Sequence, residues 1–261
     1  MKSASTRRGP KTPDGLDQVY GVHALQSLLD RGEAPRELWV QQGAGSRLKE
    51  LVAHAQSQGA RVKEQPRDLL DQLTQGAAHQ GVVGFCPPLT PEGEESLWLK
   101  LRAWPSSTPP LLLILDGVTD VHNFGACLRS ADAAGAHGVI VAKDKAAPLN
   151  ATVRKVACGA AEVVPVYQVT NLARTLAKLK DAGVWITGTA GEAEASVFDI
   201  DMTGPTALVM GAEGKGMRRL TREACDNLAK LPMAGEVSSL NVSVATGICL
   251  FEAVRQRQLA S

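Results

Sequence analysis

The sequence predicts an α/β protein with two domains, the second built on a doubly wound parallel sheet. Helical and strand patterns alternate along almost the whole chain, which is typical of this fold class. The run "LLLILDGV" at residues 111–118 is continuously apolar, as expected of a parallel strand that is covered on both faces. A proline-rich stretch, residues 87–110, separates a first α/β unit from the second, more apolar one.

The first unit spans residues 18–88 and alternates short helices with short strands. Apolar residues recur at helical spacing, as at Leu25, Leu28 and Leu29, and glycines end the helical patterns. These signals predict a compact α/β unit. Helices are expected at residues 23–32, 46–59 and 67–76, and strands at residues 36–43, 61–65 and 79–88.

Two segments outside these domains have the composition of tails and linkers. Residues 1–17 form a basic tail, in which residues such as Arg7 and Arg8 precede the first acidic residue. We expect this tail to be disordered, and both a nucleic-acid-binding arm and a solvated leader fit its composition. Residues 89–110 are expected to be a linker, although "ESLWLKLRAW" within it has the pattern of a short helix.

The second domain, residues 111–261, alternates strands and helices more densely. We expect Asn123 to begin its first helix and Gly135 to end it. Strands are expected at residues 111–118, 138–143, 163–169, 184–190, 206–211 and 229–233, and helices at residues 123–135, 150–162, 171–183, 217–225 and 240–258. The last helix is expected to bury an apolar stripe, formed by Leu240, Val244, Ile248 and Phe251.

Composition and charge argue against several classes of protein. The net charge of +1 favours no particular partner, and 4% aromatic residues give little support for base stacking on an aromatic platform. No apolar run approaches the roughly 20 residues of a membrane span, and "MKSASTRRGPK" at the start has no apolar signal segment. We therefore expect a cytoplasmic protein without membrane contact. The five cysteines form no CxxC pair and the histidines show no ligand spacing, so we expect buried free thiols and no metal site.

Three strand ends of the second domain share an unusual composition. "LDGVTDVHNFGACLR" follows the first strand, "MGAEGKGMRR" the fifth and "PMAGEVSSLN" the sixth, and each is rich in glycine and small polar residues. Ligands bind beyond the carboxyl ends of strands in such sheets, where the helix starts offer free backbone N–H groups. Together the three loops predict a pocket walled by main chain, suited to a ligand such as an adenosine.

Other nucleotide-binding motifs do not fit these loops. "GAEGKG" lacks the GxxxxGK[ST] order of a triphosphate-binding loop, and the first turn lacks the GxGxxG pattern of dinucleotide-binding domains. Any one of these loops taken alone could instead be an ordinary tight connection between a strand and a helix, without a ligand.

The combination of the three loops resembles the SpoU/TrmH class of RNA ribose 2′-O-methyltransferases, part of the SPOUT superfamily. "HNFGACLRSADAAG" is similar to its first motif, "ALVMGAEGKGMRRL" to its second and "LPMAGEVSSLNVSVATGICLFEA" to its third, and the similarity extends from residue 111 to 257. Residues 18–88 resemble the L30/L7Ae-type RNA substrate-binding domain that precedes the catalytic domain in many members. Val121 stands where the class usually has proline, a departure that we expect to leave activity intact.

This resemblance implies a SPOUT catalytic domain with a parallel sheet and a deep trefoil knot, S-adenosyl-L-methionine as cofactor, and a homodimer formed through the catalytic domains. "ILDGVTDVHNFGACLRSADAAGAHGVIVAKD" and "VRKVACGAAEVVPV" are most similar to members that methylate a guanosine in the peptidyl-transferase region of bacterial 23S ribosomal RNA. Two alternatives stay open: a tRNA or another ribosomal nucleotide as the target, and an RNA-binding assembly factor without catalysis.

The resemblance also implies catalytic roles for single residues. Arg129 is implied as the essential group, with Asn123 holding either Arg129 or the ribose. Glu213 is implied to anchor Arg129, and Ser239 and Asn241 complete the site. Chemistry alone would instead nominate His122 as the base, because imidazole titrates near neutral pH.

The cofactor pocket implied by the resemblance draws on the ends of three strands and on the third motif. Arg218 and Arg219 fit either contact with RNA phosphates or a solvated helix face. The implied cofactor-binding residues are Thr187, Gly188, Gly211, Leu231, Met233 and Leu240.

Overall fold

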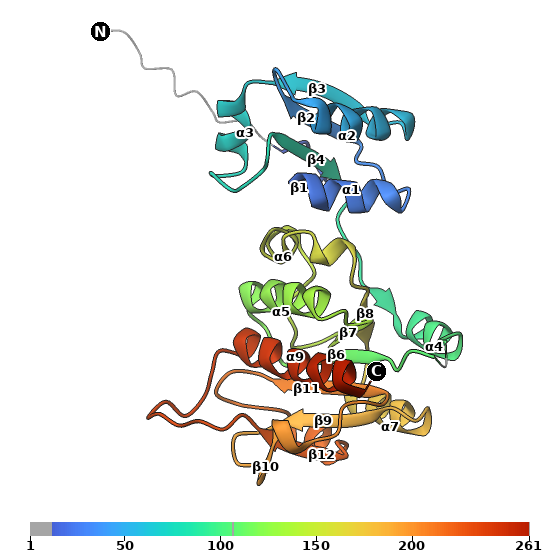
Figure 1. Ribbon diagram of the computed structural model, residues 1–261, viewed down its shortest axis with the longest axis vertical. Helices are drawn as coiled ribbons and strands as arrows, with labels where there is room; N and C mark the ends of the chain where they lie inside the picture. The colour runs from blue at the N-terminus through green and yellow to red at the C-terminus, as the bar shows by residue number, and fades with distance from the viewer. Residues whose placement is uncertain (1–11, 106, 261) are drawn as a thin grey trace. The chain divides into compact units, whose positions relative to one another are not determined.

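The computed structural model describes residues 12–105 and 107–260. The chain divides between Leu89 and Thr90 into two compact units, here named unit 1 and unit 2 (Figure 1). Most of the expected basic tail, residues 1–11, lies outside the described residues.

Unit 1 contains a four-stranded mixed sheet in the order β1-β4-β2-β3, in which β2 and β3 are parallel and the other pairs antiparallel. Its strands are β1 (Asp17–Tyr20), β2 (Glu37–Gln41), β3 (Arg61–Gln65) and β4 (Val82–Cys86), and its helices are α1 (Val22–Asp30), α2 (Ser46–Ser57) and α3 (Arg67–Leu73). The sequence predicted all of these elements except β1, because the four residues "DQVY" are too few to show an alternating pattern.

Side chains of β4 alternate between two small cores of unit 1, as the twofold period of a strand requires. Val82 lies in the cluster that Leu25 of α1 and Leu51 of α2 also join. Phe85 points to the opposite face and packs with Leu70 of α3. Unit 1 is therefore a sheet covered by helices on both sides.

Unit 2 contains an eight-stranded sheet in the order β10-β12-β9-β11-β6-β7-β8-β5, and every strand pair in it is parallel. Its strands are β5 (Glu92–Gly93), β6 (Leu111–Asp116), β7 (Gly138–Ala142), β8 (Val166–Val169), β9 (Trp185–Thr189), β10 (Ala195–Ser196), β11 (Thr206–Gly211) and β12 (Asn227–Lys230). Its α-helices are α4 (Glu94–Arg102), α5 (Val121–Ala133), α6 (Ala151–Ala157), α7 (Leu172–Asp181), α8 (Arg219–Glu223) and α9 (Val242–Ala260).

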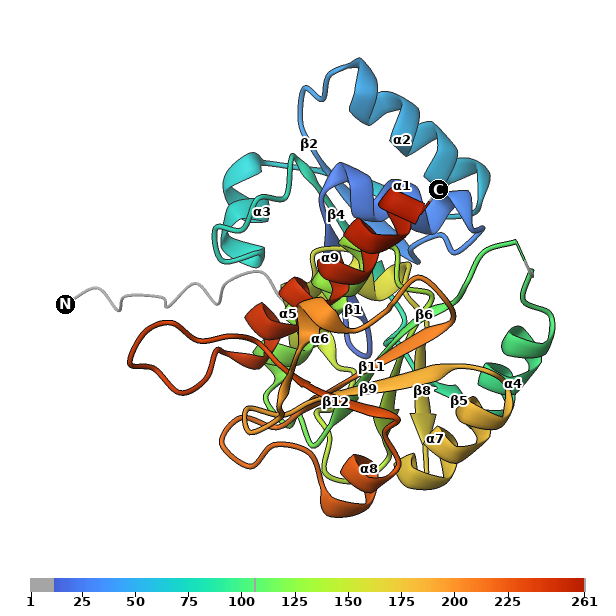
Figure 2. The same cartoon turned by 60° about the horizontal axis from the view of Figure 1, so that its bottom comes forward.

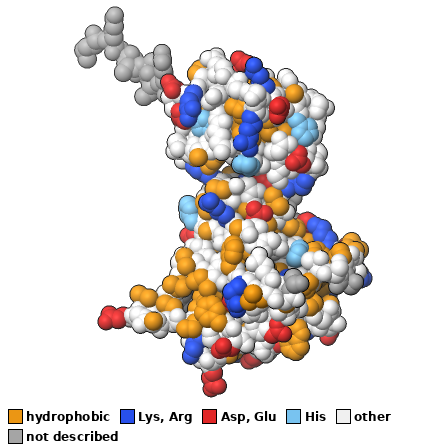
Figure 3. Space-filling view, in the orientation of Figure 1, with side chains coloured by type: hydrophobic (Ala, Val, Ile, Leu, Met, Phe, Trp, Pro, Cys, Tyr) orange, Lys and Arg blue, Asp and Glu red, His pale blue; other side chains and the backbone are white. Residues whose placement is uncertain are grey.

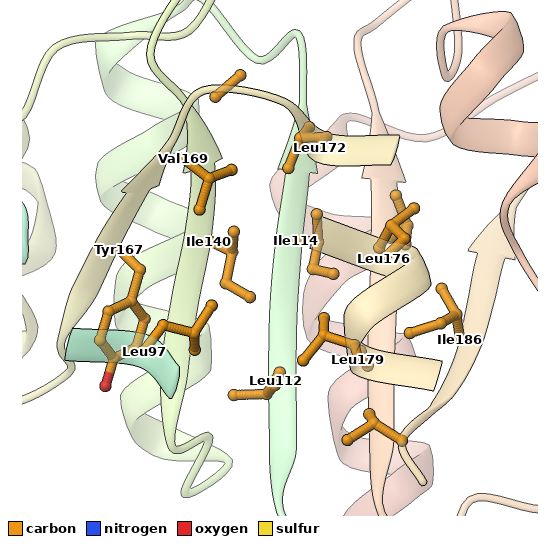
Figure 4. Close-up of a cluster of buried hydrophobic side chains, with 14 residues drawn as sticks. Leu97, Leu112, Ile114, Ile140, Tyr167, Val169, Leu172, Leu176, Leu179 and Ile186 are labelled. Atoms are coloured by element: carbon orange, nitrogen blue, oxygen red, sulfur yellow. The ribbon is translucent and has the colours of Figure 1, made fainter. Parts of the chain in front are cut away.

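Helices cover both faces of this sheet, which confirms the doubly wound α/β prediction. Figure 2 shows α5, α6 and α9 on one side and α4, α7 and α8 on the other. Leu112 and Ile114 of β6 face α7, where they pack against Leu176 and Leu179 in the cluster drawn in Figure 4. The alternate residues of β6 are also buried, so the apolar run "LLLILD" is covered on both faces as expected.

The proline-rich segment differs from the linker that the sequence predicted. Within residues 89–110, β5 pairs with β8 at the sheet edge and α4 follows it directly. Leu97 of α4 is 1% exposed and belongs to the core cluster of unit 2. Residues 92–102 are thus part of the packed second unit, because the short amphipathic helix buries one face despite the prolines around it.

The start of α5 also differs from the sequence prediction. Asp120, not Asn123, caps α5: its Oδ1 accepts hydrogen bonds from the backbone N–H groups of His122 and Asn123, both at 2.8 Å. Both residue types are good caps, and Asp120 takes the position because the helix begins two residues earlier than expected.

The prediction that the last helix buries the stripe of Leu240, Val244, Ile248 and Phe251 is wrong within a single chain. Val244 and Phe251 are 51% and 50% exposed, whereas Val242, Cys249 and Leu250 are buried. The apolar spacing that starts at Leu240 therefore marks an outer face of α9. The residues that fill the core follow a second helical spacing, shifted by two positions, that includes the polar Thr246, whose hydroxyl donates a hydrogen bond to the helix backbone.

Over residues 12–105 and 107–260, no helix is long and apolar enough to cross a membrane, and no group of three or more His, Cys, Asp or Glu side chains is arranged to hold a metal ion. Three of the cysteines are buried as expected. Cys158 is exposed and Cys225 is half-buried, which corrects the prediction that all the thiols are buried.

Candidate active site

The three glycine-rich loops meet at the carboxyl edge of the sheet in unit 2. The loops after β6 and β11 start side by side, because Gly211 and Asp116 are paired at the ends of these neighbouring strands. The third loop follows β12, which lies on the other side of β9 from β11. The parallel topology therefore brings together segments that lie more than a hundred residues apart in the sequence.

One polar residue from each loop enters a shared hydrogen-bonded cluster, here named the Asn123–Glu213–Asn241 cluster. The Asn241 side-chain amide donates to Asn123 Oδ1 at 2.8 Å and to Glu213 Oε1 at 2.6 Å. The Asn123 amide donates to the same Glu213 oxygen at 3.2 Å, and the backbone N–H of Val242 donates to it at 3.1 Å. Glu213 Oε1 thus accepts from three donors and places a carboxylate at the start of α9, where the helix dipole favours negative charge.

A hollow of about 400 Å³ lies beside this cluster and is here named the donor hollow. It is bounded by the end of β9, by the loop after β11 and by the third loop. Its lining includes residues 189–192, 210–217 and 238–240, together with Arg222, Val242 and Ala245. Much of this wall is main chain with small side chains, as the sequence predicted.

Gly211 allows the second loop to fold back over the end of β11. A Cβ atom at this position would lie 2.3 Å from the backbone carbon of Gly216 and 2.4 Å from the backbone nitrogen of Met217. The loop is closed by hydrogen bonds between Ala212 and Gly216, with N–O distances of 3.2 and 2.8 Å. Only glycine fits at Gly211 without moving main chain.

The predicted cofactor residues divide into two groups in the structure. Gly211 and Leu240 line the donor hollow. Thr187 and Gly188 lie further down β9 and are buried, and a Cβ atom at Gly188 would meet Met217 and Cys225. At the end of β9 the hollow is lined by the residues just after them, beginning with Thr189.

Leu231 and Met233 begin the third loop and are not among the residues that line the donor hollow, and Met233 is 36% exposed. Ser239, predicted for the catalytic group, does line the hollow, together with its neighbour Ser238. The alternative base His122 is exposed on the first turn of α5 and lines none of the hollows beside the loops.

Arg129 does not reach the Asn123–Glu213–Asn241 cluster within the same chain, so the predicted contact with Glu213 is not made inside one chain. It lies six residues after Asn123 on α5, a rotation of about 120° away from Asn123 around the helix axis. Its guanidinium is exposed, and Nη1 lies 3.7 Å from Cys158 Sγ. The side chain therefore projects from the face of α5 that turns away from the cluster.

The turn beneath Arg129 is fixed by a buried ion pair. Cys158 has a left-handed conformation with φ of 52°, which is uncommon for a residue other than glycine. Arg154 and Glu162 flank this turn and form a bidentate pair, with N–O distances of 2.5 and 3.0 Å. Their side chains are only 3% and 0% exposed.

A second ion pair, between Asp116 and Arg218, joins the first loop to the second. This pair was not predicted from the sequence. Asp116 ends β6 with no exposed surface and accepts hydrogen bonds from the Arg218 backbone N–H at 2.8 Å and from Arg218 Nε at 2.5 Å. An acidic residue that ends a continuous apolar strand is a signal of a buried carboxylate that needs a cationic partner. Arg219, on the exposed side of α8, pairs with Glu223 at 2.7 Å.

The thiols near the loops are not poised for nucleophilic chemistry. Burial raises the pKa of Cys127, on α5, to about 11, and the nearby charge of Glu213 acts in the same direction. Burial likewise raises the pKa of Cys249 to about 12. Both thiols stay protonated at neutral pH, and the thiolate is the reactive form.

Comparison with known proteins identifies the family of this chain. The SpoU rRNA Methylase family model matches residues 110–251, and a model of RNA 2′-O ribose methyltransferase substrate binding matches residues 18–92. The 23S rRNA (guanosine-2′-O-)-methyltransferase RlmB of Pseudomonas putida is 57% identical, over 94% of this chain and 98% of its own length. The protein of the same name from Escherichia coli K12 is 56% identical, over 92% of this chain and 99% of its own.

Solved structures give the same relationship. The SpoU methyltransferase AviRb from Streptomyces viridochromogenes, in complex with AdoMet, superposes with a TM-score of 0.75 and 27% identity, covering 94% of this chain and 92% of AviRb. An AdoMet-bound rRNA methyltransferase from Sinorhizobium meliloti superposes with a TM-score of 0.72 and 26% identity, covering 92% of this chain and 87% of its own. Fold, site and sequence together show that this chain belongs to the SpoU rRNA methylase family.

Proposed function

We propose that this chain transfers a methyl group from S-adenosylmethionine to the ribose 2′-hydroxyl of a guanosine in 23S ribosomal RNA. The observation that carries the proposal is the Asn123–Glu213–Asn241 cluster, which takes one residue from each loop and borders the donor hollow. The curated relatives at 56–57% identity carry this same activity in their names and match this chain over nearly their whole length. The chemistry takes place on ribosomal RNA, so we also infer a cytoplasmic protein.

The donor hollow fits S-adenosylmethionine in size and in the character of its walls. Its volume of about 400 Å³ lies within the range of roughly 300–1,000 Å³ usual for small-molecule sites. Backbone groups around Gly211 and Leu240 would bind the adenosine part, and the close approach at Gly211 leaves room for it. When bound, S-adenosylmethionine supplies a methyl group bonded to a sulfonium sulfur, and the neutral thioether that this sulfur becomes is a good leaving group.

Gly211→Ala tests this assignment of the donor hollow. The added Cβ would collide with the backbone of the second loop, so the loop must shift and the dissociation constant for S-adenosylmethionine should rise at least ~10-fold, the equivalent of ~1.4 kcal/mol. Isothermal titration calorimetry measures this change. The control is Gly204→Ala, where a Cβ would meet nothing within 4 Å. Equal affinities of the two variants for S-adenosylmethionine would show that Gly211 is not part of the donor site.

The chain's own residues must align the acceptor hydroxyl and take its proton. Glu213 is held by three donors, so the cluster is rigid and can hold a ribose in line with the methyl group. Alignment of this kind lowers a barrier by up to roughly 7–11 kcal/mol in favourable cases. Ser239 would close the site from the third loop. The proton of the ribose hydroxyl would leave toward Arg129 or toward water that Arg129 orients.

Since Arg129 points away from the cluster of its own chain, we propose a homodimer in which it completes the partner's site. The outer face of α9 supports this arrangement, because Val244 and Phe251 are each about half exposed and Ile248 lies between them at helical spacing. Figure 3 shows hydrophobic side chains gathered on unit 2 over the start of α9 and the loop before it. The stripe that the sequence marked for burial would then be covered by the second subunit.

Phe251→Asp tests the dimer. A charge on this face should leave the chain monomeric and lower methyl transfer at least ~10²-fold, because each site loses the partner's guanidinium. Light scattering after size-exclusion chromatography measures the mass. The matched control is Leu99→Asp on α4, which is 57% exposed against 50% for Phe251 and lies on the other side of the sheet. A wild-type monomer, or a dimeric and active Phe251→Asp variant, would contradict the proposal.

Mass-spectrometric mapping of ribose methylation in RNA from a strain lacking this protein tests the function. The proposal expects one guanosine of 23S ribosomal RNA to lose its 2′-O-methyl group and to regain it when the wild-type protein is restored. A change only in tRNA, or at another kind of ribosomal nucleotide, would assign a different target. An unchanged methylation pattern together with no binding of S-adenosylmethionine would favour an RNA-binding assembly factor instead.

A further inference from the structure

A second hollow of about 470 Å³ shares part of the second loop, including Glu213 and Gly216, with the donor hollow and is here named the Asp120 hollow. It is bounded by the first loop, by the second loop and by Lys145 from the loop after β7. Asn123 and Glu213 line it, so it touches the catalytic cluster directly. Glu213 thus lines both the donor hollow and the Asp120 hollow.

We propose that the Asp120 hollow receives the guanine base of the target nucleotide, and that Asp120 reads its exocyclic amino group. This inference rests on the function proposed above and names how the site selects guanosine. Proteins that recognise RNA by sequence bind unstacked bases and read their edges by hydrogen bonds. With the ribose at Asn123 and Glu213, the base of that nucleotide would extend toward Asp120.

Asp120 has one oxygen committed to the fold and one available to a ligand. Its Oδ1 accepts both capping bonds, from the backbone N–H groups of His122 and Asn123. Its Oδ2 accepts no hydrogen bond within residues 12–105 and 107–260. The capping bonds hold the carboxylate in place at the wall of the hollow, so that Oδ2 is preorganised to accept from an N–H donor.

Two lysines supply the complementary donors. Lys145 lines the hollow with a left-handed backbone, φ 60°, a strained conformation that non-glycine residues adopt mainly where the surrounding structure demands it. Its loop is tied to the first loop by a hydrogen bond from Ala147 N to Val118 O at 2.8 Å. Lys215 lines the hollow from the second loop. Guanine offers O6 and N7 as acceptors for such cations, whereas adenine has an amino group in place of O6.

The remaining charges favour a base over a phosphate group. Asp116 and Arg218 also line the hollow, but they neutralise each other in the ion pair between the loops. The other charged residues that line this space are two carboxylates, Asp120 and Glu213, and two lysines, Lys145 and Lys215. A phosphate would be repelled by both carboxylates, while guanine presents donors to one side and acceptors to the other.

Asp120→Asn isolates the proposed contact, because asparagine caps a helix about as well as aspartate but carries no negative charge. Single-turnover methylation by the full-length protein is measured on a 23S ribosomal RNA fragment that carries either guanosine or inosine at the mapped target. Inosine lacks only the amino group. Wild-type protein should prefer guanosine by about 10- to 100-fold, the usual effect of a hydrogen bond to a charged group. Asp120→Asn should use the two RNAs within about 3-fold of each other, a difference below 1 kcal/mol.

The matched control is Asp144→Asn, an equal change of charge on an exposed residue next to Lys145 that lines a different hollow. It should keep the wild-type preference. A wild-type preference in Asp120→Asn would overturn the inference, as would a wild-type enzyme that uses both RNAs equally. If Asp120→Asn is folded but inactive, the ratio of dissociation constants for the two RNAs with S-adenosylhomocysteine present decides by the same criterion. Failure of the wild-type protein to methylate the guanosine RNA would instead reject the proposed function.

Discussion

Arg129→Ala is expected to lower methyl transfer at least ~10²-fold, the usual scale for a group that handles a proton, while S-adenosylmethionine binds with unchanged affinity. Arg129 does not line the donor hollow of its own chain, and in the partner's site it is proposed to handle the ribose proton, so its removal should leave cofactor binding unchanged. Single-turnover kinetics on the RNA fragment and calorimetry with S-adenosylmethionine measure the two effects. His122→Ala should be far milder, and a reversed order of the two variants would make His122 the base.

A mixing experiment tests whether Arg129 acts across the dimer. Subunits with Arg129→Ala keep an intact cluster, and subunits with Glu213→Ala keep an intact Arg129. If Arg129 serves the partner's site, a mixed dimer contains one complete site, so two inactive variants should recover activity after they are mixed and reassembled. No recovery in mixed dimers that are shown to form would place Arg129 in the site of its own chain.

Arg154→Met is expected to lower the free energy of unfolding by about 3–5 kcal/mol, because it leaves the buried carboxylate of Glu162 without its guanidinium counter-charge. The pair flanks the left-handed turn at Cys158, so the loss should also loosen the support under Arg129. Urea denaturation followed by circular dichroism measures the change.

The control for this prediction is Arg219→Met. Arg219 pairs with Glu223 at 2.7 Å, but the two side chains are 75% and 56% exposed. Removal of such a surface pair should cost less than about 1 kcal/mol. Equal and small effects in Arg154→Met and Arg219→Met would show that the buried pair contributes no more to stability than a solvated one.

The sequence predicted the sheet and the meeting of the loops because both follow from local rules. A continuous apolar strand such as residues 111–116 must be covered on both faces, and parallel strands end at one edge. The three loops could therefore be expected to meet, whereas the family resemblance implied the individual residues Asn123, Glu213 and Asn241, which form one cluster in the structure. The knot implied by the family resemblance remains a prediction.

The parts that failed depend on contacts that no local pattern contains. The spacing of Val244 and Phe251 identifies an apolar face, but not whether the same chain or another molecule covers it. Asp116 finds its partner Arg218 only through the tertiary fold, across 102 positions in the sequence. The position of Arg129 relative to Asn123 is the exception, because a separation of six residues on a helix by itself turns the two side chains apart.

A crystal structure of the full-length protein with S-adenosylmethionine tests the central claim most directly, that three small-residue loops form one site for the methyl donor. The account predicts the donor in the hollow between residues 189–192, 210–217 and 238–240, with its methyl group toward the Asn123–Glu213–Asn241 cluster. A donor bound elsewhere, or a methyl group directed away from that cluster, would contradict it.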